Sequence, residues 1–199
     1  MKSLILLFSG LLIFNFSYSQ KKGKIKKNIY TAPQQIFTVA TPHKKGSYEF
    51  SYMQVKEQTE KDIIYASFGP AAFNQSIYRV DFTKKTHKAL KDISFDEFAP
   101  LAIQGYNELL SNAYNSDLVE NEKTSTTING YKAYYWKFTQ NVPEGILMNV
   151  ESKLVHYVYV VDYKIGAAVI WVQIPEFSSS EDALSPLEFA ESLTIKEEI

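Results

Sequence analysis

Hydrophobic and polar residues alternate with a period of two along much of the chain, a pattern typical of half-buried β-strands. In the first half this alternation predicts four strands, at 36–39, 48–55, 63–68 and 76–82. The segment 28–35 before them is expected to be linker, and the charged segment 54–62 is expected to be a turn. The first half therefore predicts an antiparallel meander.

After residue 94 the apolar positions recur every three or four residues, which predicts one face of a helix ending near residue 115. Its apolar positions are Phe95, Phe98, Ala102, Tyr106, Leu109 and Ala113. Ser94 and Glu97 have the spacing of a capping box, in which each side chain accepts a hydrogen bond from the backbone amide of the other residue. The same arrangement at Ser185 and Glu188 predicts a closing helix over 186–193.

Between the two helices the pattern returns to strands. Asn129-Gly130 separates the strand-like runs 118–128 and 131–140, and this pair favours a two-residue hairpin turn with positive φ at both positions. A loop over 141–149 and a second hairpin, 153–163 with 167–174, follow. Together the elements predict an α+β domain: an antiparallel β-sheet with a long central helix and a C-terminal helix packed on it.

The first twenty residues have a charged start, a short apolar run and small residues two apart, the layout of a cleaved secretory signal. The apolar run is shorter than the roughly 20 residues that a membrane-spanning helix needs. We therefore expect a signal peptide over 1–19, a basic arm and linker over 20–35, and a single domain over 36–199. This organisation predicts a soluble periplasmic or secreted protein with no transmembrane segment after cleavage.

The chain has no cysteine, so it forms no disulfide and has no thiolate chemistry. Its charge is distributed unevenly along the sequence. Six of the 21 Lys and Arg precede Asn28 but none of the 22 Asp and Glu does, so the chain from Asn28 onward carries a net charge of −7. The arm is a candidate for contact with an anionic surface through Lys21, Lys22, Lys24, Lys26 and Lys27. The alternative is a solvated tail. The acidic body argues against nucleic acid as a partner.

The order of the elements resembles the PsbP-like fold, which a Ran-binding nuclear import protein and many bacterial exported proteins share. The segments that suggest this resemblance are 36–42, 95–115, 128–133, the strand pair ending at 171–172, and 189–195. It implies a PsbP-like α/β sandwich and a non-enzymatic adaptor or assembly factor that binds other proteins. The resemblance implies no residue-level site, and it does not account for the long polar strand from Leu118 or the loop 141–149.

The sequence contains no motif for catalysis or for a cofactor. His43, His87 and His156 lack metal-site spacing, and the eight glycines form no phosphate-binding loop. No Gly-x-Ser-x-Gly motif is present for a serine nucleophile. We therefore expect a protein that is not an enzyme and has no cofactor or metal.

Aromatic residues make up 15% of the chain and are concentrated in the strands of the second half. Exposed aromatics on a rigid sheet suit protein binding, because they offer large contact area at a low entropic cost. The candidate contacts are Tyr131, Tyr135, Tyr157 and Tyr159, with the alternative that they fill the core. The sequence thus predicts an accessory protein of the bacterial envelope that docks a protein partner through a sheet face or end loops. A small-ligand carrier or a hydrolytic enzyme, with a pocket between sheet and helix, is the alternative.

Overall fold

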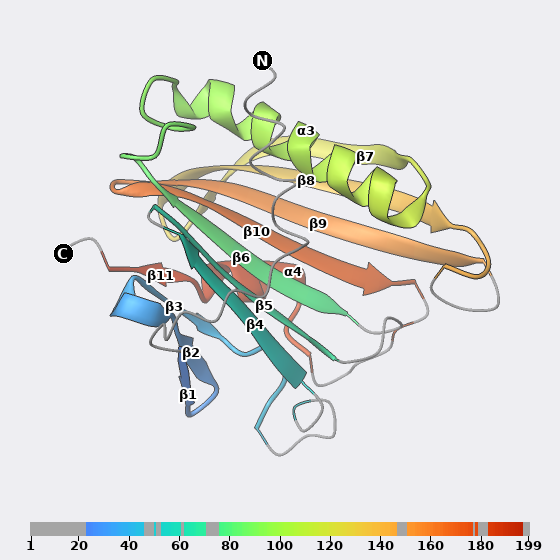
Figure 1. The fold of residues 1–199 in the computed structure, drawn as a ribbon, viewed down its shortest axis with the longest axis horizontal. Helices are drawn as coiled ribbons and strands as arrows, with labels where there is room; N and C mark the ends of the chain where they lie inside the picture. Colours follow the sequence, from blue (N-terminus) through green and yellow to red (C-terminus); the bar gives the residue numbers. More distant parts are fainter. Residues whose placement is uncertain are drawn as a thin grey trace.

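The computed structural model describes residues 23–45, 50, 53–60, 62–70, 76–146, 151–176, 178 and 183–196. In these residues the chain forms an α+β fold with two antiparallel sheets (Figure 1). The large sheet has the order β4-β5-β6-β10-β9-β8-β7, formed by Met53–Glu60, Ile63–Pro70, Ile77–Lys84, Gly166–Pro175, Ser152–Tyr163, Tyr131–Val142 and Leu118–Ile128. The small sheet has the order β1-β2-β3-β11, formed by Lys24–Lys26, Ile29–Thr31, Phe37–Ala40 and Thr194–Ile195.

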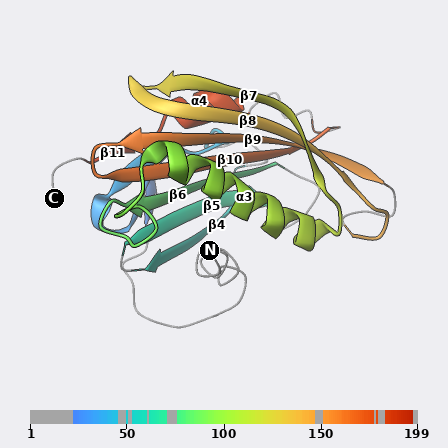
Figure 2. The same ribbon diagram turned by 90° about the horizontal axis from the view of Figure 1, so that it is seen from above.

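Helix α3, Phe95–Tyr114, lies across one face of the large sheet (Figures 1 and 2). The predicted capping box is confirmed: the Glu97 amide donates to Ser94 Oγ at 3.3 Å, and the Ser94 amide donates to Glu97 Oε2 at 2.9 Å. The side chains that the helix buries recur every three or four residues: Phe98, Ala99, Ala102, Ile103, Tyr106 and Leu110. Of the predicted positions, Phe98, Ala102 and Tyr106 are buried and Phe95 and Leu109 are half-buried, whereas Ala113 is exposed, so the predicted face is confirmed except at its C-terminal end.

The small sheet and the short helix α4, Pro186–Glu191, pack on the opposite face of the large sheet. Alternate residues of each central strand contribute to the two cores. Trp136 and Val158 join the core under α3, whereas Ala133 and Val161 join the core with the small sheet and α4. The prediction of one sheet carrying both helices is corrected here, because a second sheet is present and the two helices lie on opposite faces of the first.

Two segments that the sequence predicted as irregular contain regular secondary structure. Residues 28–35 form β2 and the 3-10 helix η2, Pro33–Gln35, and Tyr30 is 1% exposed with its ring edge-on to Phe68 at 5.1 Å. This segment is therefore part of the folded body and not a linker. The predicted turn over 54–62 is likewise wrong, since β4 occupies most of it. β4 is an edge strand of the large sheet, and charged residues are common in edge strands.

The hairpin predicted at Asn129-Gly130 is confirmed. The two residues have φ values of 52° and 81°, and they connect β7 and β8, which pair in one register from Ile128 and Tyr131 as far as Glu122 and Lys137. The Asn129 side chain also donates hydrogen bonds from Nδ2 to the carbonyl oxygens of Glu191 and Leu193, at 2.8 and 3.1 Å. The turn is thereby attached to the end of α4.

The predicted signal peptide, Lys21 and Lys22 lie outside the described residues, as does part of the predicted loop 141–149. Among the helices that the structure describes, none is sufficiently long and apolar to cross a membrane.

Candidate functional site

The tyrosines singled out by the sequence lie on one face of β8 and β9, on the side opposite α3. Tyr135 and Tyr159 are register partners, and their ring centroids are 5.0 Å apart. Tyr131 packs against Tyr163 at 4.6 Å, and Tyr157 lies on the same face of β9. The structure therefore brings together the four candidates Tyr131, Tyr135, Tyr157 and Tyr159, which we call the tyrosine face.

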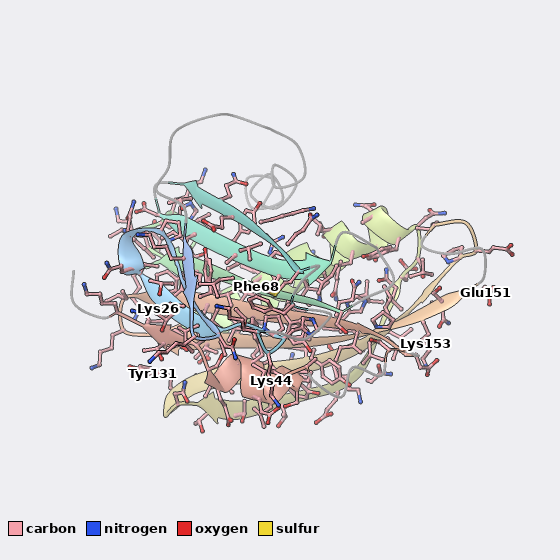
Figure 3. All side chains as sticks on the ribbon, turned by 90° about the horizontal axis from the view of Figure 1, so that it is seen from below. Lys26, Lys44, Phe68, Tyr131, Glu151 and Lys153 are labelled. Carbon is pink, nitrogen blue, oxygen red and sulfur yellow. The ribbon has the colours of Figure 1, made fainter. Side chains whose placement is uncertain are left out.

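The members of the tyrosine face differ in exposure. Tyr131, Tyr135 and Tyr157 are half-buried, and they pack against the edge of the core. Tyr159 is only 6% exposed, so it belongs to the core, which is the alternative that the sequence left open for these tyrosines. Tyr159 is buried because α4 and the small sheet pack over the centre of this face (Figure 3). The edge strand β7 and the outer part of β8 extend beyond α4 and the small sheet.

Charged and polar groups border the tyrosine face. Lys137 lies on the same face of β8, with its Nζ 5.6 Å from the ring centroid of Tyr157, and Glu122 is its register partner on the edge strand β7. Burial raises the pKa of the Tyr135 hydroxyl to about 12, and the negative charge of Glu122 adds to this effect. At neutral pH the Tyr135 hydroxyl is therefore protonated and can donate a hydrogen bond to a partner.

The lysines of the predicted arm lie in a β-hairpin. Lys24 and Lys26 belong to β1, and Lys27 and Asn28 form its two-residue turn with φ values of 50° and 60°. All three lysines are exposed, and no ion pair among the described residues includes them. In the view from below the molecule, Lys26 is visible on the same side as Tyr131 (Figure 3). The segment is therefore a fixed basic surface and not a free arm.

An open groove of about 890 Å³ lies along the outer face of the small sheet, and we call it the lysine–threonine groove. One row of side-chain positions crosses all four strands in register: Lys24 on β1, Thr31 on β2, Thr38 on β3 and Thr194 on β11. The remaining lining residues are Lys26, Ala32, Pro33, Gln34, Gln35, Phe37 and Lys196. The sequence did not reveal this site, because only the pairing of β3 with β11 brings the two ends of the chain together.

The space between α3 and the large sheet is filled by side chains. Aromatic and aliphatic groups occupy most of it, including Phe98, Tyr106, Trp136, Phe138 and Trp171.

A buried polar cluster lies near the C-terminal end of α3. His156 is fully buried, with Nε2 3.1 Å from Gln140 Oε1, and Trp171 Nε1 donates to its Nδ1 at 3.2 Å. Gln140 Nε2 in turn donates to the carbonyl oxygens of Leu110 and Ser116, at 3.2 and 2.8 Å. Burial lowers the pKa of His156 to about 3, so the imidazole is neutral. The cluster joins α3 to β8, β9 and β10.

The other histidines do not join this cluster into a metal site. Among the described residues, no three His, Asp or Glu side chains converge in a way that could hold a metal ion. His43 is 7% exposed and lies edge-on to Tyr78 with centroids 6.3 Å apart, so it packs in the interior.

Comparison with known proteins gives distant structural likenesses only. No family model and no curated protein matches the chain. A protein from Bacteroides thetaiotaomicron is similar with a TM-score of 0.48 and 12% identity over 87% of this chain, which spans 50% of that protein. The Ran-binding protein Mog1p of Saccharomyces cerevisiae is similar with a TM-score of 0.43 and 10% identity, covering 89% of this chain and 96% of that one. A point mutant of Mog1 is similar with a TM-score of 0.44 and 10% identity, over 86% and 96% of the two chains. Likenesses this distant assign neither a family nor a function.

Proposed function

We propose that the protein is a non-catalytic binding or accessory protein that docks a protein partner on its tyrosine face. The observation that carries the proposal is the half-exposure of Tyr131, Tyr135 and Tyr157 on one rigid sheet surface. Tyrosines held by neighbouring rings lose little side-chain freedom on binding, and their protonated hydroxyls supply hydrogen bonds to the partner. Lys137 and Glu122 at the border of the face give such a contact a polar rim.

The compartment and the fold family are further parts of this proposal. The secretory pattern of residues 1–19 supports an exported protein of the bacterial envelope, periplasmic or secreted, and hence an envelope protein as the partner. A PsbP-like domain is supported by the order of elements: an N-terminal strand segment, the long α3, the Asn129-Gly130 hairpin and the closing α4.

Site-specific photo-crosslinking in cells tests the docking face. A photoreactive phenylalanine analogue placed at position 135 or 157 is expected to crosslink to one reproducible protein. The matched control is position 134, since Tyr134 is also half-buried but faces α3, where its ring stacks on Phe95 at 5.7 Å. Equal crosslinking from position 134, or no product from 135 and 157, would show that the tyrosine face is not a docking surface.

A further inference from the structure

The lysine–threonine groove has a charge opposite to that of the rest of the molecule. The titratable residues that line it are Lys24, Lys26 and Lys196, and no carboxylate is among its lining residues. The chain from Asn28 onward carries a net charge of −7, so an anionic ligand is repelled by much of the protein and attracted here. We propose that this groove binds a linear anionic polysaccharide, a function separate from the docking of a protein on the tyrosine face.

The spacing of the lysines favours a ligand with several anionic groups. Lys24 and Lys26 lie two residues apart on one strand, which places their backbone positions about 7 Å apart. Thr194 on β11 lies three strand spacings from Lys24 in the same row, and Lys196 is two residues further along β11. The backbone positions of Lys24 and Lys196 are therefore about 16 Å apart. Because the side chains of a sheet stand roughly perpendicular to it, the three ammonium groups do not converge on one small anion. A chain that carries an anionic group every few ångströms can contact all of them.

The groups between the lysines suit a chain rich in hydroxyls. Thr31, Thr38 and Thr194 follow Lys24 in one row, at the strand spacing of about 4.8 Å, and each hydroxyl can both donate and accept a hydrogen bond. The apolar lining residues Ala32, Pro33 and Phe37 are buried, with Ala32 at 3% and Phe37 at 1% exposed. They offer no open pocket for the aromatic or aliphatic anchors by which peptides are usually held.

One wall of the groove has a fixed and unusual backbone conformation. Gln34 and Gln35 are consecutive non-glycine residues with φ values of 60° and 58°, which is uncommon outside sites where the surroundings impose it. The Gln35 amide donates to the Ala32 carbonyl at 3.0 Å, and the Ala32 amide donates to the Phe37 carbonyl at 2.9 Å. Both glutamine side chains are exposed at this wall, where an amide can donate to and accept from sugar hydroxyls.

Binding of polygalacturonate, a carboxylated linear polysaccharide, tests the proposal on the purified protein. The comparison ligand is the fully methyl-esterified polymer, which keeps the chain and its free hydroxyls but removes the charge. We expect titration calorimetry to show binding of the acid form that weakens as salt rises, and much weaker binding of the ester. Removing three exposed charges in the triple variant K24Q/K26Q/K196Q is expected to weaken binding about tenfold at low salt.

The matched control is K56Q/K88Q/K91Q, which removes three exposed lysines outside the groove and is expected to change affinity less than about twofold. A second variant, T31V/T38V/T194V, keeps every charge, so it is expected to weaken binding while the salt dependence stays unchanged. Equal binding by K24Q/K26Q/K196Q and its control, or equal binding of acid and ester, would overturn the proposal. Tighter binding to anionic phosphatidylglycerol vesicles than to polygalacturonate would also overturn it, in favour of a membrane surface.

Discussion

Acidification is expected to destabilise the protein through His156, which the fold keeps neutral. The imidazole is fully buried, its Nδ1 accepts the Trp171 indole N–H, and its ring lies nearly parallel to that indole, with an interplanar angle of 10° and centroids 5.9 Å apart. With Nδ1 occupied as an acceptor, the remaining proton resides on Nε2 and is donated to Gln140 Oε1. A second proton on Nδ1 would be buried and would face the indole donor, and this is why the folded state resists protonation.

The size of the effect follows from proton linkage. Burial lowers the pKa of His156 to about 3 in the folded state, whereas an unfolded histidine has a pKa of about 6.5. Between these values the unfolded state binds more protons than the folded state, so the free energy of unfolding falls as the pH falls. The loss is about 1.4 kcal/mol for each pH unit below 6.5, which gives about 2 kcal/mol between pH 7 and pH 5.

Urea unfolding of the wild type and of His156→Asn at pH 7 and pH 5 measures this contribution. The variant cannot titrate at position 156, so its stability should fall about 2 kcal/mol less than that of the wild type over this interval, whatever its stability at pH 7. The same decrease in His156→Asn and in the wild type would refute the assignment of a neutral, desolvated imidazole.

Two further stability predictions concern a buried ion pair and a helix cap. Arg79 donates to Asp81 at 2.8 Å, and burial raises the pKa of Asp81 while the guanidinium opposes this rise. Arg79→Met should therefore destabilise the protein by about 3 kcal/mol at pH 8 and by less at pH 5, because the raised pKa of Asp81 increasingly favours protonation of the unpaired carboxyl in the folded state as the pH falls. Urea unfolding at the two pH values checks this, and a deficit that does not depend on pH would contradict it. Ser94→Ala should cost about 1 kcal/mol by removing the cap of α3, whereas Ser125→Ala on the exposed strand β7 should change stability by less than about 0.5 kcal/mol in the same assay.

The sequence identified those elements whose signals lie within a few neighbouring residues of the chain. The capping box of Ser94 and Glu97 and the Asn129-Gly130 turn are local signals that the structure confirms, and the apolar periodicity of α3 is confirmed except at Ala113, which is exposed. The small sheet could not be identified in this way, because β1, β2 and β11 have only three, three and two residues. Strands this short show no measurable periodicity. Pairing of β2 and β11 with β3, pairing of β1 with β2, and the burial of Tyr30 and Ile195 hold them in place.

The periodicity of the strands accounts for only part of the tyrosine face. Side chains alternate between the two faces of a strand, so Tyr131 and Tyr135 share one face of β8, and Tyr157 lies on the same face of β9. Alternation does not say how much of that face another layer covers, and so it did not separate the buried Tyr159 from the others. The lysine–threonine groove depends on contacts between residues near 30 and residues near 195, which no local pattern encodes.

The hydrogen bonds of Asn129 have a consequence for the chemical ageing of the protein. An asparagine followed by glycine is prone to deamidation, because the unhindered glycine amide nitrogen can attack the side-chain carbonyl to give a succinimide that hydrolyses to aspartate or isoaspartate. Here the side chain is also the donor to the carbonyl oxygens of Glu191 and Leu193. Deamidation would replace that donor with a carboxylate facing two carbonyl oxygens, which repel it. Old preparations should therefore lose the attachment of the β7–β8 turn to α4 before they lose either hairpin strand.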